Sequence, residues 1–128
     1  SVEFIQRENK DIYSLLRKLL MYYLEGTVRY PNLTKSFLFE PFFNKDYNTM
    51  FVKEFSGFLN SLANKIKEIF PEKNEDEIKM AVVQIFSSVI MPGLMLDMFD
   101  HFLGSSLANA ETREKYTDLL LEQYFGSK

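Results

Sequence analysis

The chain has 128 residues, no cysteine, no tryptophan and a formal net charge of −3 at pH 7. The lack of cysteine excludes disulfides, thiolate catalysis and thiolate metal sites, and it suits a reducing cytosol. The mixed, mildly acidic charge argues against direct binding of duplex nucleic acid, which needs clustered lysine and arginine. A chain of this length can bury roughly two-thirds of its unfolded surface, so we expect one domain over residues 1–128.

Apolar residues at three- and four-residue steps predict a first helix from about Phe4 or Asp11 to about Arg29. The N-terminal stretch is polar and lacks the apolar core of a secretory signal. Tyr30-Pro31 predicts a break, because the residue before a proline avoids the α region. The same proline suits the first turn of a short second helix, which we expect to end at Glu40-Pro41.

The clearest amphipathic pattern predicts a long third helix from Asp46 to Phe70, which Pro71 ends. Its apolar face carries Phe51, Phe55, Phe58, Leu62, Ile66 and Ile69. The aromatic run from Phe37 to Phe43 contains a proline, and the chain has no second run of similar β character. We therefore interpret this run as a helix end and loop, not as a strand.

A fourth helix is predicted to begin after Asn74, which can act as its N-cap with Glu77 three residues later. From Met80 to Leu96 there is no charged residue, and the apolar arc covers roughly 200°. Such a helix can pack on its own domain with one side and on a second copy with the other, so we expect a homodimer. The stretch is too short to span a membrane, and Pro92-Gly93 is expected to kink or break it.

Helical spacing resumes from Leu94 to Leu103, and Gly104 is expected to close this segment. Asn109 is the predicted N-cap of a last helix that ends at Gly126. This last helix is also apolar on more than one side, so we expect it to share the dimer interface with the fourth helix. The residues predicted for that interface are Val83, Ile90, Tyr116, Leu120, Leu121 and Tyr124.

The inventory of catalytic residue types is small, because His101 is the only histidine. Asp97, Asp100 and His101 have a spacing that places three potential metal ligands on one helical turn. An imidazolium three residues before Gly104 also suits a helix C-terminus, and we favour that structural role. We therefore expect no catalytic residue, no metal and no cofactor. A small helical enzyme that uses these three residues with a metal remains an alternative.

Thirteen phenylalanines, seven tyrosines and six methionines favour a thick aromatic interior or a cavity lined by rings. Large aromatics at helical spacing usually fill cores, and core is the simpler role for each of them. A broken helix near Pro92 would expose backbone groups that a ligand can satisfy. The residues predicted to line a cavity for an apolar or amphipathic small molecule are Leu16, Tyr23, Phe51, Phe55, Phe58, Phe86 and Met91.

The order of these helices resembles the effector-binding domain of TetR-family transcriptional regulators. The resemblance begins with the stretch from Asp11 to Glu40, which contains Tyr30-Pro31-Asn32-Leu33. It continues through the long helix from Asp46 to Phe70 and the acidic-capped helix from Asn74 to Met91. The closing pattern is Tyr116-x-x-Leu119-Leu120-x-x-x-Tyr124-Phe125-Gly126. The resemblance covers nearly the whole chain and is carried by the helix pattern, because this domain has no sharp motif.

The resemblance implies an all-α bundle of about five to six helices, in which the last two helices typically form a four-helix dimer interface. It further implies that a small hydrophobic effector changes the spacing of two DNA-reading heads. The family's helix-turn-helix does not precede Ser1. We therefore expect a cytoplasmic fragment of a longer regulator, which reaches operator DNA only through a domain outside this chain. The alternative is a stand-alone helical module that binds another protein, a lipid or another hydrophobic ligand.

Overall fold

The computed structural model describes the backbone of residues 2–126, and it describes side chains in this range except at positions 2–12, 41, 42, 45, 47–51, 54 and 55. The described chain is all-helical, which confirms the expected bundle of five to six helices. The helices are α1 (Val2–Arg29), α2 (Pro31–Phe43), α3 (Lys45–Ile69), α4 (Glu75–Leu94), α5 (Leu96–Leu103) and α6 (Ala110–Phe125).

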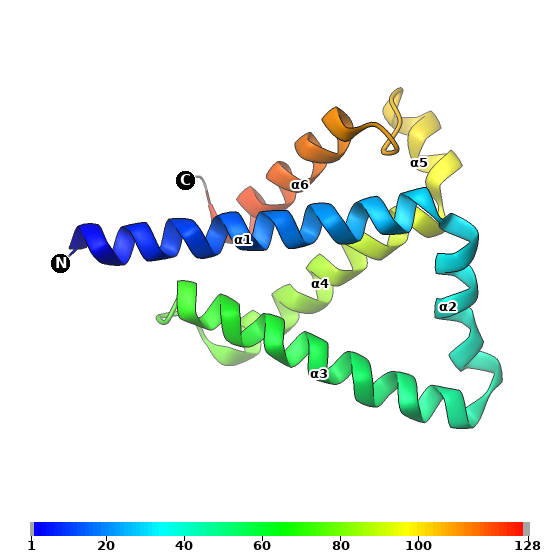
Figure 1. Cartoon of the computed structure of the whole chain (residues 1–128), viewed down its shortest axis with the longest axis horizontal. Coiled ribbons are helices and arrows are strands. Elements are labelled where there is room, and N and C mark those ends of the chain that lie inside the picture. Colours follow the sequence, from blue (N-terminus) through cyan, green and yellow to red (C-terminus); the bar gives the residue numbers. More distant parts are fainter. Residues whose placement is uncertain (1, 127–128) are drawn as a thin grey trace.

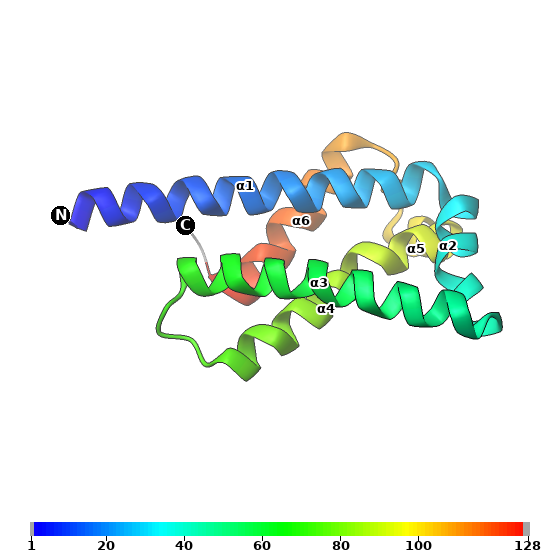
Figure 2. The ribbon, with the colours of Figure 1, turned by 60° about the horizontal axis from the view of Figure 1, so that its bottom comes forward.

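The first three helices outline an open triangle in which α2 is the short side (Figure 1). The fourth helix crosses this frame from the end of α3 toward the corner between α1 and α2, and it contacts all three helices. The last helix packs along α1, and α6 ends near the side of the molecule where α1 begins (Figure 2). The Arg17 guanidinium of α1 holds α6 through a two-pronged ion pair with Asp118, with Nε 2.6 Å from Oδ1.

The core lies where α1, α3, α4 and α6 meet. Helical spacing accounts for it, because the buried positions of each helix recur every three or four residues and so share one face. The buried apolar residues are Leu16, Leu20, Leu24, Val28, Leu62, Ala63, Ile66, Ile69, Ile78, Val82, Ile85, Val89, Leu107, Leu120 and Leu121.

Local signals set most helix ends as expected. The Asn74 side chain accepts hydrogen bonds from the backbone N–H groups of Asp76 and Glu77, so its predicted role as N-cap is confirmed. Gly104 ends α5 in the left-handed conformation with φ of 72°, which only glycine adopts without strain. Asn109 stands at the N-cap position of α6, although its side chain makes no capping hydrogen bond.

Two prolines do not interrupt their helices as predicted. The second helix continues past Glu40-Pro41 to Phe43, so the expected end at this dipeptide is wrong, whereas the rejection of a strand is confirmed. A proline this close to the end of a helix disturbs only the last turn. The chain then leaves α2 at Asn44, whose side chain accepts a hydrogen bond from the backbone N–H of Asp46.

The fourth helix likewise continues through Pro92 to Leu94, so it is not broken at the predicted place. A proline inside a helix deprives the carbonyl four residues earlier of its N–H donor. That carbonyl belongs to Ser88, and the Tyr116 hydroxyl of α6 donates to it. Burial raises the pKa of the Tyr116 hydroxyl, more than the hydrogen bond to Ser88 lowers it. The hydroxyl therefore keeps its proton at neutral pH.

Among the described residues, only the helix Glu75–Leu94 is long and apolar enough to cross a membrane. Length and composition alone are weak evidence for a span, since core helices of soluble proteins pass the same test. Its residues Ile78, Val82 and Ile85 are buried against the rest of the chain. The structure is thus compatible with a soluble protein.

Candidate functional site

The most prominent feature inside the triangle is a cavity of about 870 Å³ between α1, α2, α3 and α4. Small-molecule sites commonly occupy roughly 300–1,000 Å³ and are lined mainly by apolar side chains. The lining here is predominantly apolar, with Leu20, Tyr22, Tyr23, Glu25, Gly26, Thr27, Arg29, Tyr30, Leu33, Thr34, Phe37, Leu38, Phe58, Leu62, Ile85, Phe86, Val89 and Ile90. Its size and chemistry match those of a site for a small hydrophobic molecule.

One wall of the cavity is a chain of aromatic rings. The rings of Tyr22 and Tyr23 meet edge to face, with centroids 5.6 Å apart and planes at 77°. The rings of Tyr23 and Phe58 meet in the same way at 5.3 Å and 74°, and they connect α1 to α3. Such edge-to-face contacts favour these ring orientations by about 0.5–1.5 kcal/mol each. The wall therefore offers an aromatic, mostly apolar surface to a ligand.

Both threonine hydroxyls of the described lining are engaged within the protein. Thr27 is buried, and its Oγ1 lies 3.0 Å from the carbonyl oxygens of both Leu24 and Val89. The Thr34 hydroxyl donates to the Tyr30 carbonyl at 3.0 Å. With these two hydroxyls already bonded, the predominantly apolar lining favours a molecule with little polar surface.

The two charged residues of the described lining neutralise each other. Arg29 Nη2 lies 3.3 Å from Glu25 Oε1 one turn earlier on α1, and both side chains are solvent-exposed. An exposed pair of this kind contributes little to stability and is screened by salt. The part of the lining that the structure describes therefore carries no net charge, which matches an uncharged ligand better than an ionic one.

The structure brings part of the predicted cavity set together. Tyr23, Phe58 and Phe86 line the cavity. Leu16 does not, because it is buried in the core beside residues of α3 such as Ile66. Met91 lies outside the lining as well, and it is partly exposed on α4. The side chains of Phe51 and Phe55 lie outside the described residues.

Sequence reasoning missed the contribution of α2 to the cavity. Leu33, Phe37 and Leu38 line it from this helix, Tyr22 lines it from α1, and Tyr30 lines it from the N-cap position of α2. The signal was present, because Leu33 and Phe37 are four residues apart and so share one face of a helix. It was obscured because the aromatic run of α2 has apolar residues all around and shows no clear stripe.

The residues predicted for a dimer interface differ in how far they are buried within one chain. Leu120 and Leu121 are buried in the chain's own core, and Ile90 faces the cavity. The side chains of Tyr116 and Tyr124 are only partly exposed, so of the six predicted residues Val83 alone, with 57% exposure, stands well out from the surface. These placements remove Leu121 from any contact with a partner in this conformation.

Other apolar side chains, which were not predicted for the interface, are exposed on α4, α5 and α6. Met80 on α4 is 66% exposed and Leu119 on α6 is 60% exposed. Phe102 on α5 is 86% exposed. A surface available to a second copy would therefore use residues next to the predicted ones along α4 and α6.

Asp100 of the predicted ligand trio has a structural role. Its carboxylate accepts hydrogen bonds from the Ser106 hydroxyl at 2.8 Å and from the Leu107 backbone N–H at 2.9 Å. These bonds hold the turn that connects α5 to α6. Within the described part of the chain, no group of three or more aspartate, glutamate, histidine or cysteine residues is placed to hold a metal ion. Asp97, Asp100 and His101 therefore do not converge on one point.

Comparison of the chain with protein-family models, with curated proteins and with solved structures gives no match. The class of protein is therefore described by the fold and the cavity alone. It is an all-helical domain that contains an apolar, aromatic-walled cavity of small-molecule size.

Proposed function

We propose that this chain is the effector-binding and dimerisation domain of a cytoplasmic TetR-like transcriptional regulator. The observation that carries the proposal is the apolar cavity that lies between α1, α2, α3 and α4 and opens to solvent. The effector is an uncharged apolar or amphipathic small molecule, because the described lining is mostly apolar, its Glu25 and Arg29 pair with each other, and its two threonine hydroxyls are engaged within the protein. DNA is bound by a helix-turn-helix domain that is not part of this chain.

The exposed apolar residues of α4 and α6 support the homodimer in this proposal. Val83 and Met80 on α4 and Leu119 on α6 keep more than half of their surface exposed. Burial of such side chains between two copies releases about 25 cal/mol for each Å² of apolar surface removed from water. A ligand that fits one arrangement of the two subunits better than another then changes the population of DNA-competent dimers.

A titration with N-phenyl-1-naphthylamine, an uncharged dye that fluoresces in apolar surroundings, tests the proposed site. We expect saturable binding to the native chain, and we expect Phe58→Ala or Phe86→Ala to weaken it by about fivefold or more, because each ring supplies apolar contact area in the cavity. Phe102→Ala is the matched control, since Phe102 is 86% exposed on α5 and lies outside the lining. Equal affinity in all three variants would contradict the cavity as the binding site.

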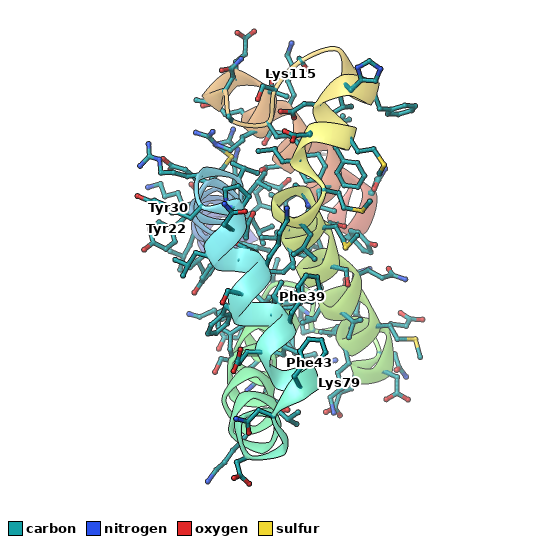
Figure 3. All side chains as sticks on the ribbon, turned by 90° about the vertical axis from the view of Figure 1, so that its right-hand side faces the viewer. Tyr22, Tyr30, Phe39, Phe43, Lys79 and Lys115 are labelled. Carbon is teal, nitrogen blue, oxygen red and sulfur yellow. The ribbon has the colours of Figure 1, made fainter. Side chains whose placement is uncertain are left out.

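A second candidate function is a stand-alone module that binds a protein or a lipid. Apolar side chains on α2 favour it, because Phe43 is 87% exposed, Leu33 68% and Phe39 47%. Figure 3 shows Phe39 and Phe43 on one side of α2, away from Tyr22 and Tyr30. Light scattering on a sizing column separates the two functions. A mass of about 30 kDa, twice the 15.1 kDa chain, supports the regulator, and a monomer supports the module.

A further inference from the structure

The Pro92 region of α4 is held by hydroxyl groups from two other helices. Because Pro92 has no N–H, the Ser88 carbonyl lacks its normal helical donor, and the Tyr116 hydroxyl of α6 replaces it. The next carbonyl, that of Val89, accepts a hydrogen bond from Thr27 Oγ1 of α1 at 3.0 Å. Two consecutive carbonyls of α4 thus connect α1 with α6.

The α1 side of this connection lies in the cavity wall. Thr27 and Val89 both line the cavity. A ligand that fills the cavity therefore touches the same two residues whose hydrogen bond joins α1 to α4. The α6 side lies outside the lining, since neither Tyr116 nor any other residue of α6 contributes to it.

The Thr27 hydroxyl has two alternative acceptors for one proton. Its Oγ1 lies 3.0 Å from the Leu24 carbonyl of its own helix and 3.0 Å from the Val89 carbonyl of α4. A hydroxyl donates only one proton, so a small displacement of α1 from α4 transfers the bond entirely to Leu24. The contact is tight, because a Cβ atom at Gly93 would lie 2.5 Å from the Thr27 carbonyl oxygen. Displacement of α1 from α4 thus replaces the hydrogen bond to Val89 by the hydrogen bond to Leu24.

We infer that the two hydroxyl-to-carbonyl bonds beside Pro92 couple occupancy of the cavity to the position of α6. This inference rests on the proposed function for its ligand. A ligand pressed between Thr27 and Val89 separates α1 from α4 and bends α4 near Pro92, so that the segment around Ser88 moves relative to the first turns of the same helix. Tyr116 follows the Ser88 carbonyl and carries α6 with it, which changes the distance between α6 and the first turns of α4. The coupling is reciprocal. The factor by which ligand binding changes the equilibrium of the Tyr116–Ser88 bond equals the factor by which formation of this bond changes the ligand affinity.

A distance measurement between α4 and α6 tests the coupling. The chain has no cysteine, so Lys79→Cys and Lys115→Cys introduce two unique sites for spin labels. Both lysines are exposed, one on α4 and one on α6 (Figure 3). We expect N-phenyl-1-naphthylamine to shift the label-to-label distance distribution measured by pulsed electron paramagnetic resonance. Tyr116→Phe should remove this shift and change the dye affinity about three- to tenfold, as expected for the loss of one hydrogen bond.

Two further variants make the test specific. Tyr124→Phe removes the hydroxyl of the other half-buried tyrosine of α6 and should keep the shift. Pro92→Ala restores the backbone N–H that bonds the Ser88 carbonyl. In the Pro92→Ala variant, Tyr116→Phe should therefore cause no additional change in the distance shift or in the dye affinity.

The outcomes separate this inference from the proposed function. If the dye binds the native chain but the distance does not change, or if Tyr116→Phe keeps both the shift and the affinity, the coupling is overturned and the cavity remains a binding site. An equal effect of Tyr116→Phe with and without Pro92 overturns it too. If the native chain does not bind the dye, both proposals fail.

Discussion

At the scale of single residues, α6 buries two polar side chains that differ in how much of their hydrogen bonding is satisfied. Arg113 is only 9% exposed, and its Nη1 donates to the carbonyl oxygens of Leu107 and Ala108 in the turn before the helix, whereas its Nε has no partner among the described residues. Thr117 is 1% exposed, and its hydroxyl has no hydrogen-bond partner among the described residues. The first side chain anchors the turn, whereas the second is buried at a cost in free energy.

Thr117→Val should raise the free energy of unfolding by about 1 kcal/mol, because a buried, unsatisfied hydroxyl is replaced by a methyl group of similar shape. Urea denaturation measures this change. Thr112→Val provides the comparison, since Thr112 lies on the same helix but is only half-buried. A loss of stability in Thr117→Val would show that the hydroxyl makes a bond in solution.

Arg113→Met should lower the free energy of unfolding by about 2–3 kcal/mol, because methionine keeps much of the apolar stem but removes the charged donors to two carbonyls. Thermal unfolding followed by circular dichroism gives the difference. Lys115→Met is the control, since the Lys115 side chain is 76% exposed and pairs only with Glu111 at 3.8 Å. Similar melting temperatures for the two variants would argue against the anchoring role.

At the scale of helices, α1 and α4 cross closely at Gly93. Of the chain's five glycines, Gly93 is the one where an added Cβ atom would meet other atoms within 4 Å. A Cβ atom on Gly93 would meet Thr27 backbone and side-chain atoms at 2.5–2.9 Å, whereas nothing lies within 4 Å of a Cβ on Gly57. Gly57 lies in the interior of α3, and Gly93 lies in the last turn of α4. Replacement by alanine changes helix propensity at both glycines but changes helix packing only at Gly93. Comparison of the two variants therefore separates the two effects on stability.

Gly93→Ala should lower the free energy of unfolding by about 1–3 kcal/mol, because the steric clash with the backbone of α1 exceeds the gain of about 1 kcal/mol in helix propensity. Gly57→Ala should raise it by about 0.5–1 kcal/mol, since only the propensity changes. Urea denaturation of the two variants measures both values. If both alanines stabilise the protein to the same degree, the close crossing is absent in solution.

At the scale of the whole molecule, the folded chain still exposes apolar side chains on α4 and α6. Val83 is 57% exposed after all contacts within the chain are made. Val52 on α3 has a similar exposure of 53%, but it is not on the helices proposed for the dimer. These two valines permit a matched test of the interface.

Val83→Glu should convert the proposed dimer into a monomer, because a charge in the centre of an apolar interface is desolvated without a partner. The molar mass from light scattering should fall to about that of one 15.1 kDa chain. Val52→Glu should keep the dimer mass. Dissociation by both substitutions, or by neither, would exclude this face of α4 as the interface.

Local chemistry was sufficient to predict the order of the helices and several of their ends from the sequence. Asn74 caps α4 and Gly104 ends α5 because their roles depend on residues within one turn. The face of α3 that carries Leu62, Ile66 and Ile69 is buried as its spacing indicates. These signals were enough to establish an all-helical domain and the order of its elements.

Tertiary structure decided how the apolar residues are used. Spacing cannot distinguish Leu121, which is fully buried, from Leu119 two positions earlier, which is 60% exposed, because α6 has apolar residues on more than one side. It also cannot show that Pro92 remains helical, since the hydroxyl that satisfies Ser88 comes from Tyr116, 28 residues away in the sequence. The cavity also depends on tertiary structure, because it forms where four helices leave space between their side chains. Each of these side chains could equally have filled a core.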